Sequence, residues 1–440
     1  MLDIKLFRET PDVVRADLDK RGRDPSAVDE VIGLDQAWRD ALKRLEELRA
    51  ERNRTAKEIP KVKGTPEGAA LLARMKQVSA EIGELENNVE EAIAKRDTLL
   101  RRLPNLMHES VPVGKDDTEN VEVRRWGKCE PHPFEAVSHV DLLESLDVAD
   151  IERAARVAGA RFFYLKNELV LISQALAQFA LASLVKKGYT AIEPPYMLRR
   201  EAIEGATDLA DFEEVIYKIE DEDLYLIATS EHALGAYHMD EILNPDLLPL
   251  KYVGVSPCFR KEAGAHGKDT RGIFRVHQFQ KVEQFVFSDP QPKEGAPGEG
   301  KTSWDLHEEL IQNAEELYQA LEIPYRIVNI CTGDLGTVAA KKYDMEAWMP
   351  VQGTFREVVS CSNCTDYQAR RWNIRTRDSP GKETRIVHTL NSTAIATQRT
   401  LVALLENHQQ ADGSVKVPEA LQPYCGGLEV IRPRSVELQG

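Results

Sequence analysis

The sequence predicts an α+β protein, in which an N-terminal antiparallel coiled-coil hairpin precedes a domain with a central antiparallel sheet flanked by helices. Three observations lead to this prediction. Two long heptad patterns fill the first hundred residues, and a turn with two prolines and a glycine separates them. From about residue 111, strand-like runs such as 214–218, 224–227 and 275–279 alternate with helical stretches. We therefore expect an arm over residues 1–110 and a second domain over residues 111–440.

The composition is that of a folded globular protein. A length of 440 residues favours two or three domains, and 42% apolar with 30% charged residues excludes wholesale disorder. Because the net charge is −16, the chain as a whole is not a basic wrapper of nucleic acid. A local basic patch is sufficient for nucleic-acid binding, so the charge alone does not exclude it.

The hairpin prediction comes from apolar residues spaced three and four apart over residues 31–59 and again over residues 71–103. The exceptions within the two seams are Arg52, Thr55 and Arg96. Helices of about 30 residues at 1.5 Å per residue would each be roughly 45 Å long. We expect Pro104 to end the second helix and residues 3–20 to form a small helix packed against the base of the hairpin.

The charge along the hairpin is uneven. Between residues 49 and 63, six bases against two acids give a local charge of +4. The six bases are Arg49, Arg52, Arg54, Lys57, Lys61 and Lys63. Two interpretations are open, a solvated coiled-coil face or a surface that lies along a phosphate backbone.

Several features predict a cytoplasmic protein without a membrane span. The first residues combine acid and base with no apolar core, so we expect no signal peptide. The longest uncharged run, residues 169–185, contains serines and glutamines and is better interpreted as a buried core helix than as a membrane span. Six cysteines form no disulfide framework, which fits a reducing cytosol.

Three segments of the second domain have the residue types that chemistry requires. The first, residues 188–196, follows the uncharged helix and contains Pro195. The second, residues 259–285, has two predicted strands flanking a glycine-bearing loop, and the third, residues 390–407, has a strand end, a polar turn and a helix. On the second strand of the middle segment, alternation places one set of residues on one face, and this set is not an apolar core pattern. Its members are Arg275, His277, Phe279, Lys281 and Glu283.

These segments resemble the three signature motifs of class II aminoacyl-tRNA synthetases. Pro195 matches the first motif, Arg260 and Glu262 match the second, and Arg399 matches the third. Over essentially the whole chain the sequence resembles the seryl-tRNA synthetase family of the common bacterial and eukaryotic type. The resemblance extends to the arm and to the segments 229–231, 275–279 and 357–363. Residues 289–303 depart from it and are interpreted as a lineage-specific loop.

The resemblance implies a serine–tRNA ligase. Such an enzyme activates L-serine with ATP and transfers serine to the 3′ end of tRNA(Ser), and we extend the expectation to tRNA(Sec). A homodimer built through the first motif is implied as well. The alternatives are an amino acid–carrier protein ligase and a non-catalytic synthetase-like tRNA-binding protein. The hairpin argues against the first, and the presence of Arg260, Glu283, Glu357 and Arg399 argues against the second.

The implied ATP site centres on two catalytic arginines, Arg260 and Arg399. Arg260 would hold the α-phosphate, where charge builds in the transition state, and Arg275 would contact the outer phosphates. Glu262 would lie near the adenine amino group, with Phe279 under the adenine and Arg399 on the opposite side. The full implied ATP set is Arg260, Lys261, Glu262, Arg275, Val276, Phe279, Glu357, Val358, Val359, Ser360 and Arg399. Glu357 and Ser360 offer hard oxygen ligands for a Mg²⁺ that accompanies ATP.

The implied serine site needs partners for an ammonium, a carboxylate and a hydroxyl group. Its residues are Thr229, Ser230, Glu231, Arg260, Glu283, Asn391 and Thr393. Glu283 and residues 229–231 would bind the ammonium, and Thr393 with Glu283 the hydroxyl, so that alanine leaves a buried polar group unpaired. Structural interpretations remain open, with Thr229 as a helix N-cap, Glu283 as an exposed strand residue and Phe279 as a core residue.

Two further predictions concern metal and RNA. Cys361 and Cys364 have the spacing of a metal ligand pair, but no second Cys or His pair follows, so we expect no zinc. The six bases of the hairpin would meet the phosphates of an RNA stem, since duplex RNA is recognised mainly through shape and backbone. In the resembled family, the hairpin is the natural part to grip the long variable arm of serine tRNAs.

Overall fold

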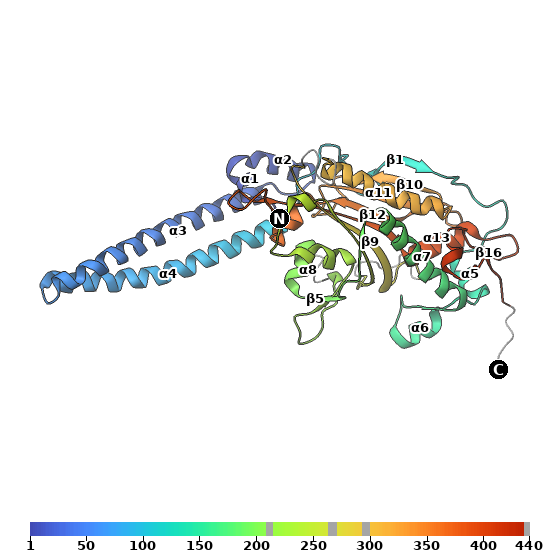
Figure 1. The fold of residues 1–440 in the computed structure, drawn as a ribbon, viewed down its shortest axis with the longest axis horizontal. Helices are drawn as coiled ribbons and strands as arrows, with labels where there is room; N and C mark the ends of the chain where they lie inside the picture. The colour runs from blue at the N-terminus through green and yellow to red at the C-terminus, as the bar shows by residue number, and fades with distance from the viewer. Residues whose placement is uncertain (208–213, 263–270, 293–299, 435–440) are drawn as a thin grey trace. The chain divides into compact units, whose positions relative to one another are not determined.

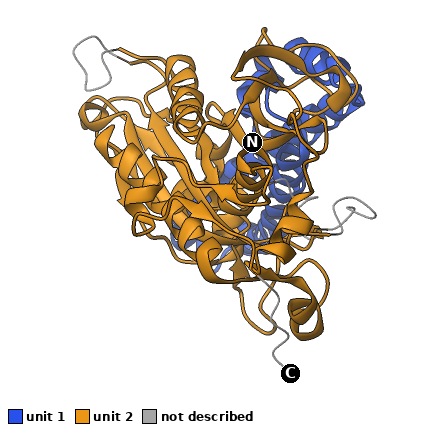
Figure 2. Ribbon diagram, turned by 90° about the vertical axis from the view of Figure 1, so that its right-hand side faces the viewer, with its two compact units in different colours: residues 1–106 blue, residues 107–440 orange. Residues whose placement is uncertain are grey.

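A computed structural model describes residues 1–207, 214–262, 271–292 and 300–434 of the chain. The chain divides into two compact units, residues 1–106 and 107–440, which are coloured separately in Figure 2. Residues 293–299, within the predicted lineage-specific loop, lie outside the described residues.

Unit 1 is entirely helical. The two long helices run antiparallel side by side (Figure 1) and confirm the predicted hairpin. The helices are α1 (Ile4–Glu9), α2 (Pro11–Lys20), α3 (Ser26–Glu58) and α4 (Pro66–Arg102), with a 3-10 turn η1 (Ile59–Val62) at the hairpin end. The single helix expected over residues 3–20 is two helices, because the chain leaves the helical conformation at Thr10 and restarts at Pro11.

The seam between α3 and α4 is partly as predicted. Leu45 and Leu48 of α3 pack against Val78 and Ile82 of α4 in one buried cluster. Thr55 is buried, but Arg52 is exposed, so its predicted place in the seam is wrong. An α-helix has 3.6 residues per turn and drifts away from a strict heptad, which carries some heptad positions out of the seam.

Unit 2 is built on an eight-stranded sheet with the order β1-β10-β11-β12-β15-β9-β8-β4. Neighbouring strands are antiparallel except β4 and β8, which are parallel. The strands, in sheet order, are β1 (Val121–Trp126), β10 (Tyr325–Asn329), β11 (Lys341–Met349), β12 (Thr354–Asn363), β15 (His388–Ala396), β9 (Gln278–Ser288), β8 (Leu250–Phe259) and β4 (Thr190–Ile192). The predicted antiparallel sheet is therefore confirmed.

Helices and short strands surround this sheet. The helices are α5 (His139–Ser145), α6 (Ile151–Ala158), α7 (Asn167–Lys186), α8 (Arg200–Ala206), α10 (Ser230–Gly235), α11 (Ser303–Ala320), α12 (Tyr367–Arg371) and α13 (Thr397–His408). The two-residue strands are β2 (Ala149–Asp150), β3 (Tyr164–Leu165), β5 (Met197–Leu198), β6 (Tyr225–Leu226), β7 (Ile242–Leu243), β13 (Arg375–Thr376), β14 (Arg385–Ile386), β16 (Val415–Lys416) and β17 (Val430–Ile431).

The main core lies between the sheet and the helices α7, α11 and α13. The helix α7 is long and apolar enough to cross a membrane by composition, but Leu169, Ile172 and Leu176 are fully buried in this core. The expected core helix is therefore confirmed. Its other face carries Leu171 and Val185, which are 51% and 47% exposed.

Two predicted strand assignments are wrong. Residues 214–218 form no strand; Lys218 forms an isolated bridge with Tyr225, and the Tyr217 carbonyl accepts from Leu226 N at 2.9 Å. The strand expected from Arg275 begins at Gln278 instead, so Arg275 and His277 precede it and do not share its alternation. The His277 backbone still meets the end of β8, since Arg260 N donates to the His277 carbonyl at 2.9 Å, and His277 Nδ1 lies 2.8 Å from the Arg260 carbonyl oxygen.

Candidate active site

A cavity of about 390 Å³ opens on the sheet face opposite the helical core. It is lined by residues from β9, β12 and β15, from α10 and from the segments beside the β8–β9 turn. The residues of the predicted ATP and serine sites that line it are Thr229, Glu231, Arg260, Glu262, Arg275, Val276, Phe279, Glu283, Glu357, Val358, Ser360, Asn391, Thr393 and Arg399. The fold thus brings together side chains that are up to 170 positions apart in the sequence.

The strand β9 places its functional residues by simple alternation. Phe279, Lys281 and Glu283 line the cavity, whereas Val282 and Val286 between and beyond them belong to the helical core. Glu283 and Lys281 are 1% and 7% exposed and form an ion pair of 2.5 Å. The interpretation of Glu283 as an exposed strand residue is therefore wrong.

One end of the cavity also holds the partly buried carboxylate of Glu231. Its Oε1 accepts hydrogen bonds from Gln368 Nε2 at 2.7 Å and from Asn391 Nδ2 at 3.0 Å. Gln368 is fixed in turn by Thr389, whose hydroxyl donates to the Gln368 carbonyl oxygen at 2.7 Å. Thr229 caps α10, as its N-cap interpretation predicts, and so fixes the start of the helix that carries Glu231.

Burial shifts the ionisation of this acidic end. Burial and the nearby Glu283 carboxylate raise the pKa of Glu231 to about 7. Burial also raises the pKa of Glu283, although Lys281 beside it acts in the opposite direction. Two carboxylates thus share one ammonium, which favours the arrival of a further cation.

The other end of the cavity carries arginines. The Arg260 guanidinium lies 5.1 Å from the centroid of the Phe279 ring and donates from Nε to the Ala228 carbonyl at 3.3 Å. Arg275 Nη1 lies 3.1 Å from Glu262 Oε2. Together these cations make this end of the cavity suitable for phosphate groups.

Arg399 also reaches this end, from the first turn of α13. Its Nη1 lies 3.2 Å from Glu357 Oε1 and donates to the Glu357 carbonyl at 3.1 Å. The ring that faces the Arg399 guanidinium is Phe274, at 5.2 Å, rather than the expected Phe279. The opposed stacking of Phe279 and Arg399 on an adenine therefore stays a prediction.

A register shift in β12 exposes a group of oxygen ligands to the cavity. The strand pairing with β11 skips Val358, so Glu357, Val358 and Ser360 all line the cavity despite their spacing. Burial raises the pKa of Glu357, but the charges of Arg399, Lys342 and Arg260 outweigh it and hold the pKa below its ordinary value. Glu357 is therefore ionised at neutral pH, and with Ser360 it fits a hard cation such as Mg²⁺.

Three residues of the predicted site have side chains that do not line the cavity. The Ser230 hydroxyl bonds to Ser256 at 2.6 Å on the buried side of α10. Lys261 lies over the Tyr217 ring, and Val359 points into the helical core. Their predicted roles remain untested.

Sequence reasoning missed several cavity residues. Among them are Thr207, His232, Phe274, Lys342 and Gln398. His232 is buried, which lowers its pKa to about 3, and its Nε2 contacts the Thr207 hydroxyl at 3.1 Å. Lys281 also lines the cavity; alternation along β9 placed it on this face, but no site role was assigned to it. The others reach the cavity from separate elements and leave no local pattern.

The two cysteines with metal-type spacing, Cys361 and Cys364, lie in different surroundings. Cys364 lines the cavity, 3.7 Å from Asn391 Nδ2, whereas Cys361 is buried in the core. Among the described residues, no group of three His, Cys, Asp or Glu side chains is arranged to hold a metal ion.

Comparison with known proteins agrees with this geometry. Residues 1–107 match the family "Seryl-tRNA synthetase N-terminal domain", and residues 216–408 match the family "tRNA synthetase class II core domain (G, H, P, S and T)". A serine–tRNA ligase from Pyrococcus horikoshii is 56% identical, over 98% of each chain.

Two solved structures are similar along nearly the whole chain. The Pyrococcus horikoshii seryl-tRNA synthetase complexed with ATP has a TM-score of 0.91 and 56% identity, over 99% of this chain and 100% of that one. The cytoplasmic serine–tRNA ligase of Naegleria fowleri in complex with AMP has a TM-score of 0.86 and 40% identity, over 99% of both chains.

The antiparallel sheet, its cavity and the matched core domain define the chain as a class II aminoacyl-tRNA synthetase, an ATP-dependent ligase. Within that class, the N-terminal domain and the whole-length identity decide the family. The chain belongs to the seryl-tRNA synthetases, or serine–tRNA ligases.

Proposed function

We propose that this chain activates L-serine with ATP and transfers the serine to tRNA(Ser). The observation that supports it is one cavity with a carboxylate pair at one end and arginines at the other. A serine carboxylate oxygen attacks the α-phosphorus of ATP, and the bond to pyrophosphate breaks. A ribose hydroxyl at the 3′ end of the tRNA then attacks the serine carbonyl, and AMP leaves.

The residues divide the work by charge. Glu231 and Glu283 are placed to receive the serine ammonium, while Asn391 and Thr393 beside them offer partners for the hydroxyl. Arg260 belongs to the arginine end, but its charge also acts on Glu231, so it is placed to meet both the serine carboxylate and the α-phosphate. Arg275 neutralises the outer phosphates, Arg399 is proposed to stack on the adenine, and Glu357 with Ser360 would hold Mg²⁺, which supplies further positive charge to the phosphates.

The direct test is serine-dependent exchange between ATP and pyrophosphate, followed by a charging assay with tRNA(Ser). We expect exchange with serine and none above background with alanine or threonine. Exchange without tRNA charging would favour the amino acid–carrier protein ligase, and tRNA binding without exchange the non-catalytic protein. The arm supports the proposed function over both, and charging of tRNA(Sec) is a further expectation of the same assay.

We place the tRNA contact on the hairpin. Its six predicted bases are all exposed, and only Arg49 forms an ion pair among the residues the structure describes, at 2.7 Å from Glu86. Neutralising the six bases should weaken tRNA binding and flatten its salt dependence, because fewer counterions are released. Serine activation should persist, which separates this result from a folding defect. Unchanged charging at low tRNA concentration would contradict the proposal.

We expect a homodimer in the cytoplasm, in line with the relative described as cytoplasmic. The outer face of α7 carries Val170, Leu171 and Val185, which are 39%, 51% and 47% exposed, next in sequence to the segment with Pro195. A second copy of the chain covers such a face in a two-fold interface. Light scattering at micromolar concentration should give twice the mass of one chain.

A further inference from the structure

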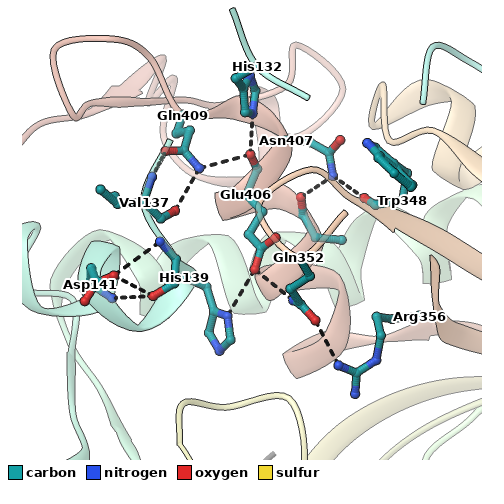
Figure 3. Close-up of polar contacts among 12 residues, drawn as sticks. His132, Val137, His139, Asp141, Trp348, Gln352, Arg356, Glu406, Asn407 and Gln409 are labelled. Atoms are coloured by element: carbon teal, nitrogen blue, oxygen red, sulfur yellow. Dashed lines mark hydrogen bonds and ion pairs between the residues drawn. The ribbon is translucent and has the colours of Figure 1, made fainter. Parts of the chain in front are cut away.

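A buried carboxylate outside the cavity forms a cluster of its own. Glu406 lies on α13 two turns after Arg399, among the fully buried leucines of that helix. Its Oε1 accepts a hydrogen bond from Gln352 Nε2 at 2.9 Å and lies 3.3 Å from His139 Nδ1 (Figure 3). Its Oε2 has no hydrogen-bond partner among the described residues. A fully buried carboxylate costs free energy, so its presence in an apolar helix requires an explanation.

The cluster continues from Glu406 to a cation. Gln352 lies in the turn between β11 and β12, and its Oε1 accepts a hydrogen bond from Arg356 Nη1 at 2.9 Å. A carboxylate only accepts, so the Gln352 amide nitrogen must face Glu406 and its oxygen must face Arg356. Gln352 thus links Glu406 to the Arg356 guanidinium through two hydrogen bonds, which are drawn as dashed lines in Figure 3.

Arg356 belongs to the phosphate end of the site. Its guanidinium lies 4.1 Å from the centroid of the Phe274 ring, and Arg399 approaches the same ring at 5.2 Å. A cavity of about 490 Å³ adjoins the first one and shares Phe274, Arg275 and Arg399 with it. Arg356 and Lys342 line this second cavity as well. Three of these cations, Arg275, Lys342 and Arg399, are paired with the carboxylates Glu262, Asp344 and Glu357. Arg356 is held instead by its hydrogen bond to Gln352.

The same cluster supports Phe274 from behind. Gly272, with φ of +77°, lies against His139 so closely that a Cβ atom would be 2.2 Å from His139 Nε2. The short segment that carries Phe274 and Arg275 therefore rests on His139, which faces Glu406. Glu406 thus contacts both His139, which lies behind the Phe274 segment, and Gln352, which binds Arg356.

We propose that Glu406, Gln352 and His139 are positioning residues that hold Arg356 and Phe274 in place for the outer phosphates of ATP. The inference rests on the proposed function for its substrate. A purely structural role for the cluster would change stability and would affect serine and ATP alike. A positioning role changes the response to ATP selectively.

The test uses four variants of the full chain. Gln352→Leu removes both hydrogen bonds from an exposed turn, and Gln352→Glu places a second carboxylate against Glu406. The double variant Gln352→Glu with Glu406→Gln reverses the amide and the acid, so an amide nitrogen still faces a carboxylate that accepts from Arg356. Gln319→Leu is the matched control, because Gln319 donates to Tyr325 at 2.8 Å and lines neither cavity.

The KM for ATP in pyrophosphate exchange should rise about fivefold in Gln352→Leu and further in Gln352→Glu, as expected for a lost hydrogen bond to a charged group. The double variant should return toward wild type, and the KM for serine should stay within about twofold throughout. Equal rises for both substrates, or a double variant no better than Gln352→Glu, would overturn the proposal.

Calorimetric binding of a non-hydrolysable ATP analogue gives an independent measurement. It needs neither serine nor tRNA, so it tests the positioning role even if serine-dependent exchange is absent and the proposed function fails. The affinity should fall about fivefold in Gln352→Leu and remain unchanged in Gln319→Leu. An affinity equal to that of wild type in Gln352→Leu would contradict the inference.

Discussion

Two carboxylates, the buried Asp35 of unit 1 and the partly buried Glu231 of unit 2, have opposite surroundings. In unit 1, Asp35 is 1% exposed and meets three guanidinium groups, those of Arg8 at 2.7 Å, Arg39 at 3.1 Å and Arg96 at 3.0 Å. In unit 2, the hydrogen-bond partners of Glu231 among the described residues are the neutral amides of Gln368 and Asn391. The first carboxylate is fully compensated, and the second is not.

The pKa shifts follow from this difference. The hydrogen bond from Arg8, with those from the neighbouring arginines, lowers the pKa of Asp35. Burial raises the pKa of Glu231 to about 7. Asp35, which is paired with three arginines, holds helices together, whereas Glu231, which is hydrogen-bonded to neutral amides, can bind the cation of a ligand. The two carboxylates therefore differ in whether a cation is hydrogen-bonded to them, and this difference separates a structural charge from a ligand-binding one.

The largest effect is expected where a cation meets the transition state. Arg260→Ala should reduce serine-dependent pyrophosphate exchange on the order of 10² to 10³ or more, because one partner of the developing charge is lost. Arg326→Ala is a suitable control, since that guanidinium also stacks on a ring, Phe355 at 4.6 Å, but lines neither cavity. Exchange near the wild-type rate in Arg260→Ala would show that the assignment is wrong.

Breaking the compensated cluster should affect stability rather than chemistry. Asp35→Asn leaves three arginines without their shared anion and should lower the free energy of unfolding by about 3 kcal/mol. This is the lower end of the range for a broken buried ion pair, because Arg8 and Arg39 are partly exposed to water. Urea unfolding of the full chain measures it, with exposed Asp40→Asn as the control. Serine activation should remain.

The pH dependence of the same cluster has a definite sign. Because the folded pKa of Asp35 is lowered, its contribution is present above the unfolded value of 3.8 and is lost as the pH falls toward the folded value. Asp35→Asn should therefore lose less stability than wild type on acidification from pH 5 to pH 3. Parallel acid profiles would contradict the role of Asp35.

For the uncompensated carboxylate, the prediction concerns ligand affinity. A pKa of about 7 means that Glu231 takes up a proton as the pH falls below neutrality. The protonated acid does not attract an ammonium, so the KM for serine should rise about tenfold per pH unit below pH 6, while the KM for ATP changes little. Glu231→Gln should bind serine weakly and remove this dependence. A flat wild-type profile from pH 5.5 to 8 would refute the prediction.

The sequence predicted the features that depend on contacts within one element and missed those that depend on contacts between elements. The hairpin and the residues Phe279, Lys281 and Glu283 depend on periodicity within one element, so a heptad or an alternation reveals them. The cavity position of Glu357 depends on a register shift against β11. The contact of His232 with Thr207 depends on how α8 packs beside α10. No pattern within one segment encodes such contacts.

The errors have physical reasons as well. Residues 214–218 have the composition of a strand, yet they find no partner strand beyond the bridge at Lys218. The expected strand face of Arg275 and His277 was extrapolated past Gln278, the first residue of β9. Arg275 still lines the cavity, whereas His277 Nδ1 faces the Arg260 carbonyl. In both cases tertiary contacts override the local preference.

The smallest effect is expected for the exposed charges of the hairpin. Arg49 and Glu86 pair at 2.7 Å with both side chains nearly half exposed, so Glu86→Gln should leave the melting temperature unchanged within measurement. The same change frees Arg49 for an RNA phosphate and should lower the KM for tRNA(Ser) by at most about twofold. Glu84→Gln is the control, because it removes the same charge from an exposed residue of α4 that forms no ion pair among the described residues. An equal gain in both variants would mean that overall charge, and not the release of Arg49, sets the affinity.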